Sequence, residues 1–197
     1  MERTRSAIVA AARTEFAIRG YGGATIGGIA SAAGLSESTV YEHYGSKAGL
    51  AAASFAGGHA EAVAALRADG AAPLTRLHNH LGRVYALLVA DRAGTKALFD
   101  AVMEVTVEGP PTSPTDPRVL VPLPDVMVPV ISDAQAEGEL GAGVDPWTIA
   151  GHLVGLLMLN VLMNPMEPEA ACRRIEDLAF GGLYRESIGG DGPAGRV

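Results

Sequence analysis

Apolar residues recur along this chain at spacings of three and four positions, which is the period of an α-helix. Near the N-terminus, Ile8, Ala11 and Phe16 fall on one helical face. This first pattern ends near Gly20, a residue suited to closing a helix. The strict apolar–polar alternation of a half-buried strand is scarce. We therefore predict an all-α protein.

Two short helices are expected after the first one, each preceded by a residue that can cap it. Thr25 precedes a helix over residues 26–33, and Gly34 follows it. Ser36 precedes a helix that runs to about Tyr44. A side-chain cap is typically worth about 1 kcal/mol, which matters for helices this short.

Longer amphipathic patterns fill the rest of the chain and bring the expected number of helices to about nine. They cover residues 47–66, 73–90, 93–107, 128–137, 146–163 and 168–188. Seven of the 12 prolines lie between Pro110 and Pro129, so a long loop is expected before residue 128. The tail, residues 189–197, is expected to be frayed.

Composition excludes several classes of protein. Of the 197 residues, 48% are hydrophobic and 19% charged, which is enough apolar surface for a core. The single cysteine, Cys172, excludes an intrachain disulfide framework and a multi-thiolate zinc site. No secretory signal is visible, and the apolar stretch over residues 149–163 is shorter than a bilayer span. A soluble cytoplasmic protein is expected.

Charge is unevenly distributed. Residues 1–50 hold five basic and four acidic side chains, a balance of +1 within a chain of net charge −7. The remaining residues therefore carry −8. A near-neutral N-terminal segment on an acidic body is a weak indication of an anionic partner at that end.

Residues 25–44 have helix-turn-helix spacing: a helix, a tight turn at Gly34, and a second helix whose first turns are free to meet a ligand. Such a helix fits the major groove of DNA, where side chains on its first turns reach base edges. Hydroxyl and amide groups at helix starts can contact phosphates.

Many further positions match in register the pattern of one family. The stretches are Ile8-x-x-Ala11-Ala12-x-x-x-Phe16-x-x-x-Gly20-Tyr21, Thr25-x-x-x-Ile29-Ala30-x-x-Ala33-Gly34-Leu35-Ser36 and Thr39-Val40-Tyr41-x-His43-Tyr44-x-Ser46-Lys47-x-x-Leu50. They resemble the tetracycline-repressor (TetR) family of transcriptional regulators. The resemblance covers about residues 5–50, and a weaker one includes Gly138-Glu139-Leu140.

The resemblance implies a homodimer with two domains: a DNA-binding head over residues 1–46 and an effector-binding, dimerising helical body over residues 47–188. The residues it implies at DNA are Thr25, Ser36, Glu37, Ser38, Thr39, Tyr41, His43 and Lys47. The residues expected to line an effector site are Leu81, Tyr85, Phe99, Met103 and His152. A mostly apolar lining favours an apolar or aromatic effector.

The last two helices are expected to form the dimer interface. The helix over residues 146–163 is apolar nearly all round, so it needs cover on every side. It can pack inward on one face and against a symmetry mate on another.

Histidines allow more than one interpretation. A satisfied buried histidine is the favoured interpretation of His152, ahead of contact with an effector. His78 and His80 point to different helical faces, so either could face a pocket, but joint metal ligation is not expected. No cofactor or metal site is predicted.

The expected function is a repressor released from a palindromic operator by a small molecule. The recognition helix has no Lys or Arg, however, and Glu37 stands where related proteins often carry a basic residue. Alternatives are an activator, an effector-dependent DNA binder, or a dimeric ligand-binding protein with a weakened head. A helical enzyme is not favoured, because we find no nucleophile–base pair or clustered carboxylates.

Overall fold

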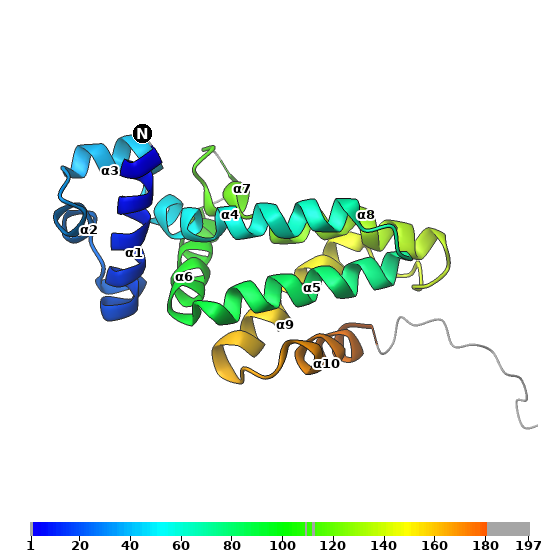
Figure 1. Cartoon of the computed structure of the whole chain (residues 1–197). Coiled ribbons are helices and arrows are strands. Elements are labelled where there is room, and N and C mark those ends of the chain that lie inside the picture. Colours follow the sequence, from blue (N-terminus) through cyan, green and yellow to red (C-terminus); the bar gives the residue numbers. More distant parts are fainter. Residues whose placement is uncertain (1, 109, 112, 181–197) are drawn as a thin grey trace, which may run out of the picture.

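The computed structural model describes residues 2–108, 110–111 and 113–180, and every regular element in them is a helix. The helices are α1 Glu2–Gly23, α2 Ile26–Ala33, α3 Glu37–Tyr44, α4 Lys47–Ala68, α5 Pro73–Ala90, α6 Arg92–Glu108, α7 Pro117–Leu120, α8 Leu123–Ala136, α9 Pro146–Met163 and α10 Pro168–Phe180. Figure 1 shows α1–α3 gathered at one end of the molecule, with α4 and α5 running away from them. The all-α prediction is confirmed.

The two predicted helix caps, Thr25 and Ser36, are present, and Ser46 and Asp145 cap α4 and α9 in the same way. Each of the four side chains accepts a hydrogen bond from the backbone amide three residues further along the chain. Gly20 has φ of +66° and interrupts α1, so the first regular run ends where the sequence predicts. Each cap satisfies one amide that the helix itself leaves unpaired.

The proline-rich segment differs from the prediction. It contains the one-turn helix α7, and α8 begins at Leu123, about five residues before the predicted start. Pro124 occupies the first turn, where a missing N–H costs nothing. Pro129 lies inside α8 and is exposed, so its ring does not interrupt the packing of the buried face. With α7, the described residues hold ten helices rather than about nine.

The end of the chain lies outside this description. The last helix is described as far as Phe180, and the predicted end near residue 188 and the predicted frayed tail over residues 189–197 fall among residues that the structure does not describe.

Two apolar clusters organise the molecule. The larger one joins α4, α5, α8, α9 and α10. The smaller one joins α1–α3 to the first turns of α4, and it also includes Ala97 and Ala101 of α6. Helix α6 therefore completes the core of the N-terminal domain from outside the predicted boundary at residue 46, and that boundary remains a prediction.

Helix α9 has 18 residues and a mean hydropathy of 1.5, long and apolar enough by length and composition alone to cross a membrane. The expectation of a shorter stretch overlooked the first turn, Pro146 to Thr148. The helix packs against α5, α6, α8 and α10. A core helix of a soluble protein has the same composition.

Candidate functional site

The turn between α2 and α3 sets the angle at which α3 leaves the N-terminal domain. Gly34 has φ of +69° in the left-handed region, and its amide reaches back to the end of α2. The next amide, that of Leu35, donates to the Ala30 carbonyl at 2.9 Å. Because glycine adopts a positive φ without the strain that a Cβ causes, this position favours glycine. The result is a helix-turn-helix.

The first turn of α3 presents a cluster of hydroxyl groups. Ser36 Oγ lies 2.8 Å from Ser38 Oγ and 2.9 Å from Thr39 Oγ1. The same oxygen accepts from the Thr39 amide at 3.3 Å. Ser36 and Ser38 are exposed. Neutral hydroxyls of this kind both donate and accept, which suits contacts with phosphates or base edges.

The other side chains predicted to contact DNA differ in their exposure and direction. Tyr41 is 50% exposed, and Thr25 is exposed next to its cap bond with Gly28. His43 is half-buried. The Glu37 carboxylate folds back over α2, because a Cβ added at Gly27 would lie 2.7 Å from its Oε1. Glu37 therefore partly covers a glycine backbone.

Lys47 is directed into the N-terminal domain. Its Nζ donates to the Tyr21 carbonyl at 2.9 Å and lies 4.3 Å from the centroid of the Tyr21 ring. A longer contact, 3.4 Å, joins Nζ to the Ala24 carbonyl. These contacts hold α4 against the end of α1. The Lys47 ammonium is therefore engaged within the protein and would have to leave these contacts to bind a phosphate.

Two further cations, Arg3 and Arg5, lie in the first turn of α1, and Arg5 is next to the end of α3. The Tyr44 hydroxyl donates to the Arg5 carbonyl at 3.1 Å, which fixes the first turns of α1 against the end of α3. Burial raises the pKa of Tyr44, so its hydroxyl stays protonated. The exposed guanidinium groups of Arg3 and Arg5 have no hydrogen bond or ion pair with the residues that the structure describes.

The body holds a large apolar pocket of about 770 Å³. Its walls come from α6, from the segment between Arg118 and Asp125, and from α9. Its polar groups already have partners: the Thr106 hydroxyl donates to the Val102 carbonyl at 2.6 Å, and Asp125 accepts from the Trp147 indole at 3.3 Å. Such a lining fits a mainly apolar molecule.

Two of the five predicted pocket residues line this space, Phe99 and Met103. Leu81 lines a smaller neighbouring cavity instead. Tyr85 is fully buried, and its hydroxyl lies 3.1 Å from Asn160 Oδ1 and accepts from the Met166 amide at 3.0 Å. The prediction that His152 is buried is wrong, because His152 is exposed on α9, and it does not line the apolar pocket.

Sequence reasoning missed the α9 wall. Trp147, Gly151 and Gly155 are spaced four apart and line the pocket together with Met158. The two glycines lack the side chains that would fill the space: nothing lies within 4 Å of a Cβ added at Gly155. An aromatic residue followed by two glycines at helical spacing was the available signal.

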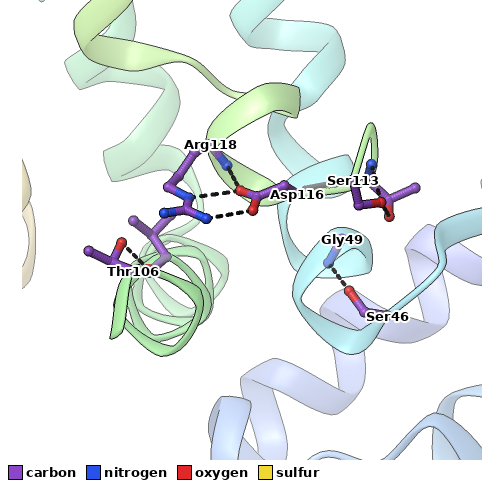
Figure 2. A network of polar contacts seen from close by, with 8 residues as sticks. Ser46, Gly49, Thr106, Ser113, Asp116 and Arg118 are labelled. Atoms are coloured by element: carbon purple, nitrogen blue, oxygen red, sulfur yellow. Dashed lines mark hydrogen bonds and ion pairs between the residues drawn. The ribbon is translucent and has the colours of Figure 1, made fainter. Parts of the chain in front are cut away.

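Helix α6 contacts the pocket and the N-terminal domain at once. Phe99 and Val102 face the pocket, whereas Ala97 and Ala101 are buried against α1. Arg118 follows on the other wall, and its Nη2 lies 2.7 Å from Asp116 Oδ2 (Figure 2). This hydrogen bond holds the pKa of Asp116 below its usual range.

The segment before α7 reaches the start of α4. Figure 2 shows Ser113 beside the turn in which the Gly49 amide donates a hydrogen bond to the Ser46 hydroxyl. A Cβ added at Gly49 would lie 2.6 Å from the Thr115 carbonyl oxygen, and one added at Gly45 would lie 2.6 Å from Thr115 Oγ1. Thr115 therefore sits directly on the junction of α3 and α4.

The chain thus joins a helix-turn-helix domain to a helical body that holds an apolar pocket. Residues 8–54 match the model of bacterial regulatory proteins of the tetR family. The resemblance to this family of transcriptional regulators, drawn from the sequence, is confirmed over these residues.

Solved structures with a similar fold cover nearly the whole chain. One, described as the molecular basis for control of antibiotic production by bacterial hormones, is 27% identical, covers 94% of this chain and 100% of its own, and has a TM-score of 0.63. The ketosteroid transcriptional regulator KstR2 of Mycobacterium tuberculosis is 19% identical over 92% of this chain and 95% of its own, with a TM-score of 0.63. The fatty acid degradation regulator FadR from Bacillus halodurans is 19% identical over 90% and 98%, with a TM-score of 0.65. No curated protein matches the sequence.

Proposed function

We propose that this chain is a homodimeric transcriptional repressor that binds a palindromic operator and leaves it when a small apolar molecule fills the pocket. The observation that carries the proposal is the shared use of α6, which walls the pocket on one face and completes the core of the N-terminal domain on the other. An occupant that displaces α6 must also displace α1 or open that core, because packed cores do not deform continuously.

On this proposal the operator is held by three groups of side chains. The hydroxyls of Ser36, Ser38 and Thr39 meet bases or backbone at the start of α3. Thr25, Tyr41 and His43 contact phosphates, with charge supplied chiefly by Arg3 and Arg5. Glu37 and Lys47 act mainly within the head, in view of their contacts with α2 and Tyr21.

The dimer that the proposal requires uses α9 and α10. Leu159 is 54% exposed, Met163 79% and Leu178 64% in the single chain. A second copy of this chain is the occupant we propose for this surface, because the other face of the same two helices already belongs to the main core. In such a dimer two recognition helices about 34 Å apart would meet successive major grooves.

Coupling between pocket and operator follows two routes. One runs through α6, and the other runs from Arg118 in the pocket wall to Thr115 against Gly45 and Gly49. The first route ends at α1 and the second at the junction of α3 and α4, and both of these positions set the orientation of α3. A coupling free energy of about 1–3 kcal/mol changes DNA affinity by about 5–150-fold.

The test uses Trp147, the single tryptophan of the chain, which lines the pocket. Fatty acids, ketosteroids and γ-butyrolactones, ligand classes named for structural neighbours, are titrated against its fluorescence. Molecules that bind are then added to the protein–DNA complex. We expect a binder to lower DNA affinity at least fivefold. Saturation of the pocket by every binder without any change in DNA affinity would refute the coupling.

A second candidate is a ligand-binding dimer whose head no longer holds DNA. The absence of Lys and Arg from α3, together with the inward direction of Lys47, favours it. It predicts the same pocket binding and dimer, but no selective affinity for any duplex. An activator would share the DNA and ligand binding, and the operator position relative to the promoter distinguishes it.

A further inference from the structure

Two buried histidines, one on α4 and one on α5, have ring nitrogens without the partners that buried polar groups normally have. His80 is 1% exposed and His59 is 4% exposed. Neither ring nitrogen of His80 has a partner within normal hydrogen-bond geometry, and neither has Nε2 of His59. Because a buried polar group without a partner costs about 1–3 kcal/mol, such a pair needs an explanation.

The surroundings of His80 define its protonation. Burial lowers its pKa to about 4, and the Ala62 carbonyl, toward which the ring can donate, acts in the opposite direction. The neighbouring His59 and Arg83 lower the pKa further. His80 is therefore neutral near pH 7, with one N–H and one nitrogen lone pair. If the N–H turns to Ala62, the lone pair is left to accept a hydrogen bond.

His80 lines a small recess of about 10 Å³ whose other walls are apolar. This volume is close to that of a single water molecule on the same measure. Three residues, Leu123, Val154 and Met158, line both this recess and the large pocket, so the recess adjoins the inner wall of the pocket. Met158 is flexible enough to admit a small group past it.

We propose that His80 is a specificity-determining residue of the pocket, which accepts a hydrogen bond from one hydroxyl or N–H group at the end of an otherwise apolar ligand. The recess has room for about one heavy atom, which excludes a bulky head group. This inference rests on the proposed use of the pocket for a small molecule.

The test compares two probes that differ only in the donor: 4-hexylphenol and its methyl ether, 4-hexylanisole. Binding is followed by Trp147 fluorescence on the full chain. The ether is the more apolar molecule, so an apolar pocket without a polar contact would bind it at least as tightly. We expect the wild-type chain to bind the phenol about tenfold more tightly than the ether.

Variants then locate the preference. His80→Leu should bring the affinity ratio to about one, chiefly by weakening the phenol, and His80→Gln should restore part of it. His78→Leu is the matched control on the same helix, because His78 lies outside both cavities and its Nδ1 is 3.0 Å from Glu176. It should leave the ratio unchanged.

Three results would overturn the inference. Equal affinity of the wild-type chain for the two probes would remove the role of His80 while leaving the pocket in place, and it needs no variant to be measured. A tenfold preference that survives in a folded His80→Leu variant would assign the donor contact elsewhere. Failure of both probes to bind would overturn this inference together with the ligand site of the proposed function.

Discussion

The carbonyl oxygen of Thr115 lies against the Cα of Gly49, so close that a Cβ at position 49 would stand 2.6 Å from it. The same Cβ would also overlap the Tyr44 carbonyl oxygen at the end of α3. Gly49 thus allows the segment before α7 to touch the junction between the recognition helix and α4. The contact is made of backbone, which cannot rotate away as the end of a side chain can.

Replacing Gly49 with alanine should force these backbones apart. We expect Gly49→Ala to lower the free energy of unfolding by about 1–3 kcal/mol, measured by urea denaturation. The matched control is Gly57→Ala, also in α4, where nothing lies within 4 Å of the added Cβ. That variant should gain up to about 1 kcal/mol from helix propensity. Equal effects of the two substitutions would contradict the close contact at Gly49.

The charge on the DNA-binding surface should come from Arg3 and Arg5. Removing one phosphate contact lowers the slope of log K against log salt concentration by about 0.9. We expect Arg5→Gln to weaken DNA binding and to reduce that slope by about this amount, with thermal stability unchanged. Arg19→Gln is the control, because Arg19 pairs with Glu15 at 2.9 Å near the other end of α1.

Replacing Lys47 should affect the stability of the protein more than the salt dependence of DNA binding. Because its ammonium bonds the Tyr21 carbonyl and lies over the Tyr21 ring, Lys47→Met should reduce the melting temperature more than the salt slope. A Lys47 variant that keeps its stability but loses a full phosphate contact would show that the side chain turns outward on DNA.

The buried His80 should make stability depend on pH. Its pKa is about 4 in the folded chain, against an ordinary value of 6.5. Between these values the unfolded chain binds the proton and the folded chain does not. The stabilisation is therefore fully present above about pH 6.5 and is lost as the pH falls towards 4. The loss amounts to about 3 kcal/mol at 1.36 kcal/mol per pKa unit.

The comparison of wild-type with His80→Leu isolates this effect from the titration of carboxylates. The difference in unfolding free energy between the two chains should change between pH 7 and pH 4 in favour of the variant. Burial also lowers the pKa of His59, which adds a change of the same sign to both chains. A difference that stays constant over this range would show that His80 is not held neutral.

The proposed dimer can be tested on its exposed apolar surface. Leu159→Asp on α9 places a charge in the proposed interface, and we expect it to convert a dimer to a monomer by light scattering. Ile18→Asp is the control, since Ile18 is 72% exposed on α1, away from α9 and α10. A monomeric wild-type chain, or a dimer that survives Leu159→Asp, would contradict the interface.

Helices in this chain could be predicted where periodicity and caps agree. The bounds of α2, α3 and α9 follow from Thr25, Ser36 and Asp145, whose side chains bond nearby amides. A helix cap depends on only a few adjacent residues, so it can be recognised in the sequence. The start of α8 was missed because its prolines count against a helix, whereas burial of residues such as Met127 and Ile131 outweighs their cost.

The pocket could be predicted only in part, because its walls meet through tertiary packing. Phe99 and Met103 lie on a helix whose apolar face is plain in the sequence. Trp147 and Arg118 reach the same space from segments far along the chain. His152 is exposed, although its apolar helix favours burial, whereas His80 on α5 is buried. A shift of one position along a helix changes which side chains face the core.

The measurement that tests the central claim most directly is selection of bound DNA from a pool of random duplexes by the full chain at two salt concentrations. We predict enrichment of an inverted repeat, bound by two copies of the chain, with an affinity that falls steeply as salt rises. A folded, dimeric protein that enriches no sequence even at low salt would contradict the repressor and leave a ligand-binding dimer.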